Sequence, residues 1–86
     1  MNIGFNNQVA WWKVSAILGY SRGRGGQRLI EVAEKFGKLS DATQGRRRRS
    51  MILTDDGLVI LSSVTPETLI LRLNKLRRKG EKDDDD

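Results

Sequence analysis

The sequence has no cysteine and no histidine, one proline and five aromatic side chains among its 86 residues. The missing cysteine excludes disulfide bonds, thiolate zinc sites and cysteine nucleophiles, and the missing histidine excludes histidine-based triads and metal clusters. Carboxylates are also scarce, since six precede residue 81 and two of these stand in a turn motif, which leaves no convincing acid–base pair for an enzyme. We therefore expect a protein that is not an enzyme and that needs neither a metal nor a cofactor.

Long hydrophobic runs are missing too. No segment approaches the roughly 20 apolar residues that a bilayer-spanning helix needs, and the N-terminus lacks the basic-then-apolar pattern of a signal peptide. We therefore expect a cytoplasmic protein. A chain of this length forms one small domain, which buries only about two thirds of its unfolded surface and is often completed by a partner subunit.

Charge is distributed unevenly along the chain. Sixteen Lys and Arg residues face eleven Asp and Glu residues, for a net charge of +5, but five of those acids lie in residues 81–86. Residues 1–80 hold fifteen basic and six acidic side chains, which is a net charge of +9. A domain with this excess of positive charge favours a polyanionic partner. We expect a single domain over residues 1–79 and a disordered acidic tail over residues 80–86.

Hydrophobic periodicity predicts four strand segments and two helices. Asp55-Asp56-Gly57 between two strand-like runs predicts a hairpin. Thr65 followed by Pro66 predicts a helix start, and Gly37 predicts the end of the earlier helix. The predicted strands are residues 10–20, 39–43, 46–54 and 58–64, and the predicted helices are residues 26–36 and a segment that starts at residue 66.

The apolar residues exceed what one small core can bury. The expected core consists of Trp12, Val14, Leu18, Leu29, Ile30, Val32, Phe36, Leu69, Ile70 and Leu73. The remaining apolar residues are expected to form an interface between subunits, because a strand that is apolar on both faces is central in a sheet or covered by another chain. These expected interface residues are Trp11, Ile17, Leu58, Ile60 and Leu71.

Four consecutive arginines, Arg46 to Arg49, are the most informative feature of the sequence. On the predicted strand they would alternate between its two faces. Arginine carries a fixed charge and a planar fork that pairs with phosphate or with guanine edges. The alternative is an edge strand protected from aggregation by charge, for which one or two charges would suffice. The run therefore favours anion binding.

The segment Ser21 to Gly26 contains three glycines and two arginines, Arg22 and Arg24, before the first predicted helix. The Arg-Gly-Arg core is similar to short minor-groove binders, in which two guanidiniums enter a narrow groove. A flexible basic connector is the alternative. The segment lacks the Gly-Lys-Ser/Thr of a nucleotide-binding loop.

The order of three segments closely resembles the RemA family of small bacterial DNA-binding regulators of extracellular-matrix genes. The resemblance covers roughly residues 2–74. It depends on the Asn-Ile-Gly-Phe start, on Asp-Ala-Thr-Gln-Gly-Arg-Arg from Asp41, and on the Pro-Glu-Thr helix start at Pro66. This chain departs from the family pattern at Arg48, where threonine is more usual, in the basic glycine-rich loop, and at the bulky pair Trp11-Trp12.

The resemblance implies a compact α+β subunit with a small antiparallel sheet of about four to five strands, two helices and LytTR-like contacts. It also implies that the subunit closes into a homo-oligomeric ring of about seven to eight subunits and binds double-stranded DNA in the nucleoid. It places DNA binding on Arg46 and Arg47, with Arg49 nearby. Lys13 stands where the family commonly has an arginine, and Arg28 matches a basic helix position. An RNA-binding or ribosome-associated domain is the alternative function, and a membrane-surface adaptor is a third. The expected DNA-binding residues are Lys13, Arg22, Arg24, Arg28, Arg46, Arg47, Arg48 and Arg49.

Overall fold

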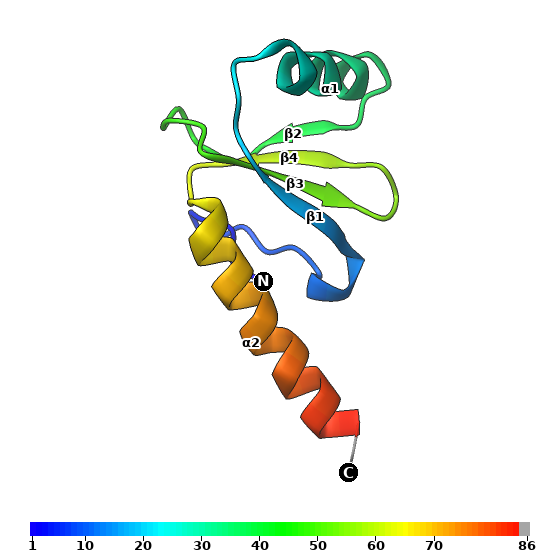
Figure 1. Cartoon of the computed structure of the whole chain (residues 1–86), viewed down its shortest axis with the longest axis vertical. Coiled ribbons are helices and arrows are strands. Elements are labelled where there is room, and N and C mark those ends of the chain that lie inside the picture. The colour runs from blue at the N-terminus through cyan, green and yellow to red at the C-terminus, as the bar shows by residue number, and fades with distance from the viewer. Residues whose placement is uncertain (85–86) are drawn as a thin grey trace.

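The computed structural model describes the backbone of residues 1–84 and the side chains of residues 1–79 (Figure 1). A four-stranded sheet lies between two helices, which confirms the predicted α+β class. The first helix follows the first strand, and the second helix ends the described chain. In chain order the elements are the 3₁₀ turn η1 (Trp11–Lys13), β1 (Val14–Gly19), α1 (Arg24–Lys35), β2 (Leu39–Asp41), β3 (Ser50–Thr54), β4 (Val59–Ser62) and α2 (Pro66–Asp84).

The sheet is mixed rather than antiparallel throughout. Its strand order is β1-β3-β4-β2, with β1 and β4 antiparallel to β3 but β2 parallel to β4. The prediction of a purely antiparallel sheet is therefore wrong at one edge. A long connection from β2 through the arginine run and the β3–β4 hairpin reverses the chain twice, so β4 returns alongside β2 in the same direction.

The β3–β4 hairpin and the start of α2 follow local signals in the sequence. Gly57 has a φ of +83° in the hairpin turn, a left-handed conformation that suits glycine. The Thr65 hydroxyl accepts a bond of 3.4 Å from the backbone N–H of Thr68, which caps α2 as predicted. The backbone of α2 continues through residues 80–84, within the segment expected to be an acidic tail, and residues 85–86 lie outside the described residues.

Each face of the sheet is covered by an element of the same chain. Side chains of β4 alternate between the two sides: Ile60 joins the cluster under α2, whereas Val59 and Leu61 join the cluster under α1. This confirms β4 as a strand buried on both faces and corrects the expectation that Ile60 meets another subunit. Ile60 is 6% exposed. The α2-side cluster also contains the N-terminal residues Met1 and Ile3.

The first predicted strand begins later than expected. Trp11 to Lys13 form a 3₁₀ turn, so the two tryptophans do not lie on opposite faces of a strand. Their rings meet edge to face with centroids 5.8 Å apart. Trp11 packs against the α2-side core, whereas Trp12 is 65% exposed, which reverses the expected roles of the pair.

Several other residues expected in the core lie at the surface. The helices each bury one narrow stripe, formed by Ile30 and Ala33 on α1 and by Leu69 and Leu73 on α2. Apolar residues beside these stripes remain exposed, because a helix that packs on a sheet turns only one side toward it. The expected core residues that are instead exposed are Trp12, Leu18, Val32, Phe36 and Ile70.

None of the described helices is both long and apolar enough to cross a membrane.

Candidate nucleic-acid interface

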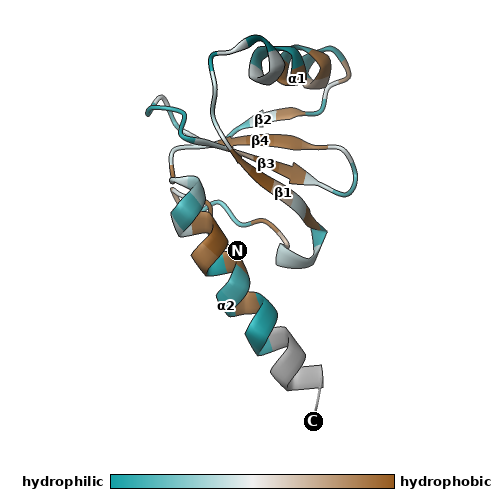
Figure 2. Cartoon of the chain, viewed as in Figure 1, coloured by the Kyte–Doolittle hydropathy of each residue, from teal (hydrophilic) through white to brown (hydrophobic). Residues whose placement is uncertain are grey.

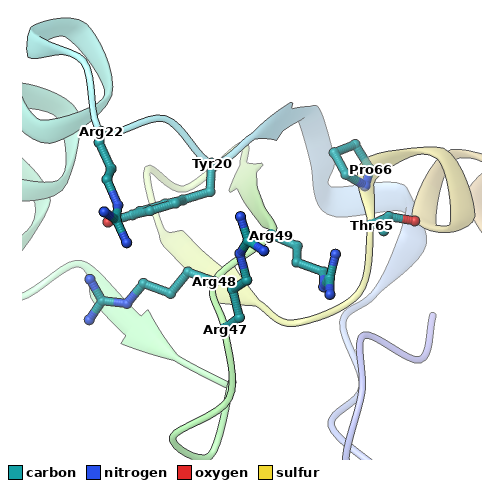
Figure 3. Close-up of a pocket in the computed structure, with 7 residues that line it drawn as sticks. All are labelled: Tyr20, Arg22, Arg47, Arg48, Arg49, Thr65 and Pro66. Atoms are coloured by element: carbon teal, nitrogen blue, oxygen red, sulfur yellow. The ribbon is translucent and has the colours of Figure 1, made fainter.

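The four arginines lie in the loop between β2 and β3, which we call the arginine loop (residues 42–49). The sequence predicts a strand from residue 46, but β3 begins only at Ser50. The arginines therefore do not alternate across a sheet. In the loop the side chains of Arg47, Arg48 and Arg49 point in different directions (Figure 3).

Backbone geometry fixes the loop at its turn and at its exit. Gly45 has a φ of +78°, and this left-handed turn directs the chain into the arginines. The N–H of Arg46 donates to the Thr43 carbonyl at 3.0 Å, which closes the turn. The N–H of Arg49 donates to the Ser62 carbonyl at 2.9 Å, and its carbonyl accepts from the N–H of Tyr20 at 3.0 Å. The last arginine is thus tied to the chain on both sides of β3.

Asp41 anchors the start of the loop. Its Oδ1 accepts from the backbone N–H of Thr43 at 2.9 Å and from the Thr43 hydroxyl at 2.6 Å. The hydroxyl bond is the main cause that lowers the pKa of Asp41 below its ordinary value, with smaller contributions from the Thr43 N–H and from Arg48. Thr43 is almost fully buried, so the anchor is a fixed part of the fold.

Arg48 is held within the protein by two partners. Its Nη2 lies 3.1 Å from Asp41 Oδ2, and its Cζ lies 5.9 Å from the centre of the Tyr20 ring. The Tyr20 hydroxyl also accepts a bond of 3.2 Å from Gln27 Nε2 on α1. The bond from Gln27, followed by the nearby Arg48, lowers the pKa of Tyr20, while Tyr20 and then Asp41 raise the pKa of Arg48.

Three segments of the chain converge on an open hollow beside the arginine loop (Figure 3). The segment after β1 contributes a tyrosine and an arginine, the loop contributes three arginines, and the start of α2 contributes its cap and first residue. The hollow has a volume of about 520 Å³. Its lining residues are Tyr20, Arg22, Arg47, Arg48, Arg49, Thr65 and Pro66.

A second hollow adjoins the first, because Arg47 and Arg49 line both. Its other lining residues are Phe5 from the N-terminal turn, Arg46 and Ser63, and its volume is about 450 Å³. The two hollows together place five arginines in one continuous region. Four of the five come from the arginine loop, and Arg22 comes from the glycine-rich segment.

The charges in this region are largely uncompensated. Among the side chains of residues 1–79, the pair Arg48–Asp41 is the one ion pair. Arg22, Arg46, Arg47 and Arg49 therefore have no carboxylate partner within that part of the chain. Clustered guanidiniums repel each other in the absence of an anion, and their planar forks suit phosphate oxygens. The arrangement can hold several phosphate groups at once.

The other predicted DNA-binding residues lie apart from this region. Lys13 stands at the opposite end of β1, where its carbonyl accepts from the N–H of Asp55 at 2.8 Å. The length of β1 separates the two ends by roughly 17 Å. Arg24 and Arg28 are exposed on α1 and line neither hollow. Within one subunit the structure brings Arg22 to the arginine loop and leaves these three residues outside it.

Helix α1 begins at Arg24, earlier than predicted, so the second half of the glycine-rich segment is helical. A Cβ at Gly26 would lie 2.8 Å from the Ser21 carbonyl oxygen, so glycine permits a close approach of the helix to the preceding segment. Arg24 is already helical whereas Arg22 precedes the helix. The two arginines are therefore not in one extended segment, the arrangement that the minor-groove hypothesis needs.

Some residues of the site were not found from the sequence. Tyr20, Phe5 and Thr65 line the hollows, and Asp41 positions Arg48, although none of them was a candidate. Phe5, Tyr20 and Thr65 come from segments far from the arginine run in sequence, whereas Asp41 lies seven residues before Arg48. The Asp-x-Thr pattern at Asp41 was available as a local turn signal, because Asp side chains bond the backbone two residues on.

Comparison with known proteins identifies relatives over most of the chain. The family model described as "RemA-like: Extracellular matrix regulatory protein A-like" matches residues 1–73. A protein of Thermodesulfovibrio yellowstonii is 39% identical over 83 residues, which are 96% of this chain and 96% of that protein. A Clostridium kluyveri protein is 44% identical over 84 residues, or 98% and 87% of the two chains. A Synechococcus protein is 47% identical over 72 residues, or 84% and 80%. All three are named "putative regulatory protein".

Proposed function

The chain belongs to the RemA-like family, and from this premise we propose that it acts as a regulator by binding double-stranded DNA through its arginine loop. The names of its relatives support a regulatory role. Regulation of extracellular-matrix genes follows from the family description and belongs to the same proposal.

One observation carries the proposal: four arginines without carboxylate partners surround two adjoining hollows at one end of the sheet. Phosphate contacts supply most of the affinity of proteins that bind DNA with little sequence preference. The arginines extend from a loop rather than from a helix that could enter the major groove. Binding is therefore expected to tolerate many sequences and to depend on the phosphate backbone.

We propose further that the subunits form a closed homo-oligomer. Two separate apolar patches are exposed, Val32 with Phe36 on α1 and Ile70 with Leu71 on α2, and the two helices lie toward opposite ends of the molecule. Contact between different patches on neighbouring subunits builds a ring or a filament. A second subunit would also be needed for Lys13 to reach an arginine loop.

The oligomer would strengthen DNA binding by repetition. One subunit makes only a few phosphate contacts. In an oligomer, once one subunit has bound, the other subunits contact the same DNA molecule in intramolecular steps, which raises the overall affinity. The predicted interface residues Trp11, Ile17 and Leu58 are only partly buried within the subunit, so they retain some apolar surface for such contacts.

An RNA-binding function is the second candidate. Sequence-specific RNA recognition stacks unpaired bases on exposed aromatic rings. In the hollows, the ring of Tyr20 already lies under Arg48, and Phe5 is the other aromatic residue of the lining. Phe5 is 42% exposed, so the hollows offer one free aromatic ring beside five arginines, and this excess of charge over stacking surface favours duplex DNA.

A competition experiment tests the proposed function. A labelled duplex bound to the full chain is challenged with unlabelled duplex, structured RNA or anionic vesicles at matched phosphate concentration. Unlabelled duplex is expected to displace the label most effectively, and Arg47→Ala is expected to weaken the complex at least roughly tenfold through loss of a charged hydrogen bond. More effective displacement by RNA or by vesicles would contradict the proposal.

A further inference from the structure

Helix α2 carries a second basic surface, which we call the basic stripe (Arg72, Lys75 and Lys79). These residues are three and four positions apart, so they share one side of the helix. All three side chains are exposed, whereas the stripe of Leu69 and Leu73 is buried against the sheet. Figure 2 shows hydrophilic and hydrophobic bands alternating along α2. Lys75 and Lys79 are therefore not used in the packing of α2, whereas Arg72 contacts the N-terminal segment.

The N-terminal segment connects the basic stripe to the arginine loop. Arg72 Nη1 donates to the backbone carbonyl of Asn2 at 3.0 Å. Three residues later in the chain, Phe5 lines the second hollow together with Arg46 and Arg47. Only a short, fixed turn separates the two basic regions. The arginine loop and the basic stripe are thus joined through residues 2–5, whose own side chains are uncharged.

Among the side chains of residues 1–79, no ion pair with a carboxylate accounts for Arg72, Lys75 or Lys79. Cations stabilise the last turn of a helix, but Arg72 and Lys75 lie more than two turns before Asp84. Lys75 and Lys79 are four residues apart, a spacing at which like charges destabilise a helix. From Pro66 to Lys79 the one acidic residue is Glu67, in the first turn. An anion from outside the subunit would relieve this repulsion.

The chemistry of α2 favours a nucleic acid over a membrane surface. A membrane-bound helix presents a broad apolar face beside its basic one. Here the apolar stripe is used in the core, since Leu69 is fully buried and Leu73 nearly so. The exposed Ile70 lies on the side of α2 away from Lys75 and Lys79, whereas the exposed Leu71, four residues before Lys75, lies beside the basic stripe, so the proposed subunit contact borders this stripe.

We propose that the basic stripe binds the sugar–phosphate backbone of the same duplex that the arginine loop contacts, an inference that rests on the proposed function. From Pro66, which lines the first hollow, to Lys79 the helix rises about 20 Å. That length corresponds to about six base pairs of duplex. Each subunit would therefore contact the DNA at two places, with α2 as a spacer of fixed length between them.

A matched pair of variants tests this inference on the full chain. Lys75→Gln/Lys79→Gln removes two charges from the basic stripe. Lys35→Gln/Lys38→Gln removes the same charge near the start of β2, the end of that strand farther from the arginine loop. Duplex affinity and particle mass are measured for the wild type and both variants. We expect the α2 variant to bind roughly tenfold more weakly than the control at low salt, with unchanged mass.

The outcomes separate this inference from the proposed function. If the wild type binds duplex and both variants bind equally well, the inference is wrong and the proposed function stands. If the wild type fails to bind duplex, both are wrong. A loss of oligomer mass in the α2 variant would show that this side of α2 contacts a second subunit instead, which would also overturn the inference.

Discussion

The guanidinium of Arg48 lies between the carboxylate of Asp41 and the ring of Tyr20, 3.1 Å from Asp41 Oδ2 and with its Cζ 5.9 Å from the ring centre. Arg48 thereby joins the end of β2 to the segment that follows β1. Sequence alone placed it among the DNA contacts. Its two partners make it a residue that positions the arginine loop, while Arg46, Arg47 and Arg49 remain available to phosphate.

The role of Arg48 predicts a coupled effect with Asp41. Arg48→Ala should weaken duplex binding less than Arg47→Ala, because Arg48 would act by holding the loop. Asp41→Asn should reduce duplex affinity by about as much as Arg48→Ala does. The double variant should bind duplex no more weakly than whichever single variant has the lower affinity. Affinities of the three variants measured on one duplex provide the test. Additive losses would show that Arg48 contacts DNA independently of Asp41.

The lowered pKa of Asp41 predicts acid sensitivity. A carboxyl group whose pKa is lowered by folding stabilises the protein at pH values above its unfolded pKa, about 3.9, and loses this contribution as the pH falls through the folded value. The free energy of unfolding should therefore decrease below about pH 5. Asp41→Asn should remove part of that decrease. The pKa of Asp56 is also lowered in the folded protein, so Asp56 contributes to the same decrease. Denaturant titrations at several pH values check this, and identical pH profiles would contradict it.

A substitution at Gly45 is expected to change the free energy of unfolding through the backbone conformation alone, without new side-chain contacts. Its φ is +78° and a Cβ there would meet no atom within 4 Å, so Gly45→Ala should cost about 1–2 kcal/mol of unfolding free energy through the left-handed backbone alone. Gly25→Ala is the matched control, because its site in α1 is equally open and has no positive φ. The control should stabilise by about 0.5–1 kcal/mol. Equal thermal shifts in the two variants would contradict the role of Gly45.

Ile60 and Leu71 differ in exposure, so substitutions at these two residues distinguish effects on folding from effects on assembly. Ile60 is 6% exposed in the core and Leu71 is 71% exposed on α2. Ile60→Glu should unfold the subunit, because an unpaired carboxylate in an apolar core costs several kcal/mol. Leu71→Glu should leave the circular dichroism spectrum unchanged and reduce the particle mass. A folded Leu71→Glu variant that keeps the wild-type mass would exclude Leu71 from the proposed interface.

Local signals in the sequence predicted much of the fold. The Asp55-Asp56-Gly57 turn and the Thr65-Pro66 helix start depend on neighbouring residues, and both are observed. The parallel pairing of β2 with β4 depends on contacts between distant segments, and periodicity holds no information on it. The burial of Met1 and Ile3 was missed for the same reason, since neither belongs to a periodic segment.

The sequence located the arginine cluster of the candidate site but not its geometry. That the arginine run binds anions stays a prediction, and the expected strand from residue 46 was wrong because β3 begins at Ser50. The approach of Arg22 to the loop depends on the path of the chain after β1. The pairing of Arg48 with Asp41 depends on the length of that loop. Neither relationship follows from spacing along the sequence.

The dependence of duplex affinity on salt tests the central claim most directly. If the arginine loop binds phosphates, the logarithm of the binding constant falls with the logarithm of salt concentration by about 0.9 per phosphate contacted. We predict a steep negative slope for the wild type and, for Arg47→Ala, a slope smaller in magnitude by about 0.9 per bound subunit. A wild-type slope near zero, or an unchanged slope in Arg47→Ala, would contradict a phosphate-binding arginine loop.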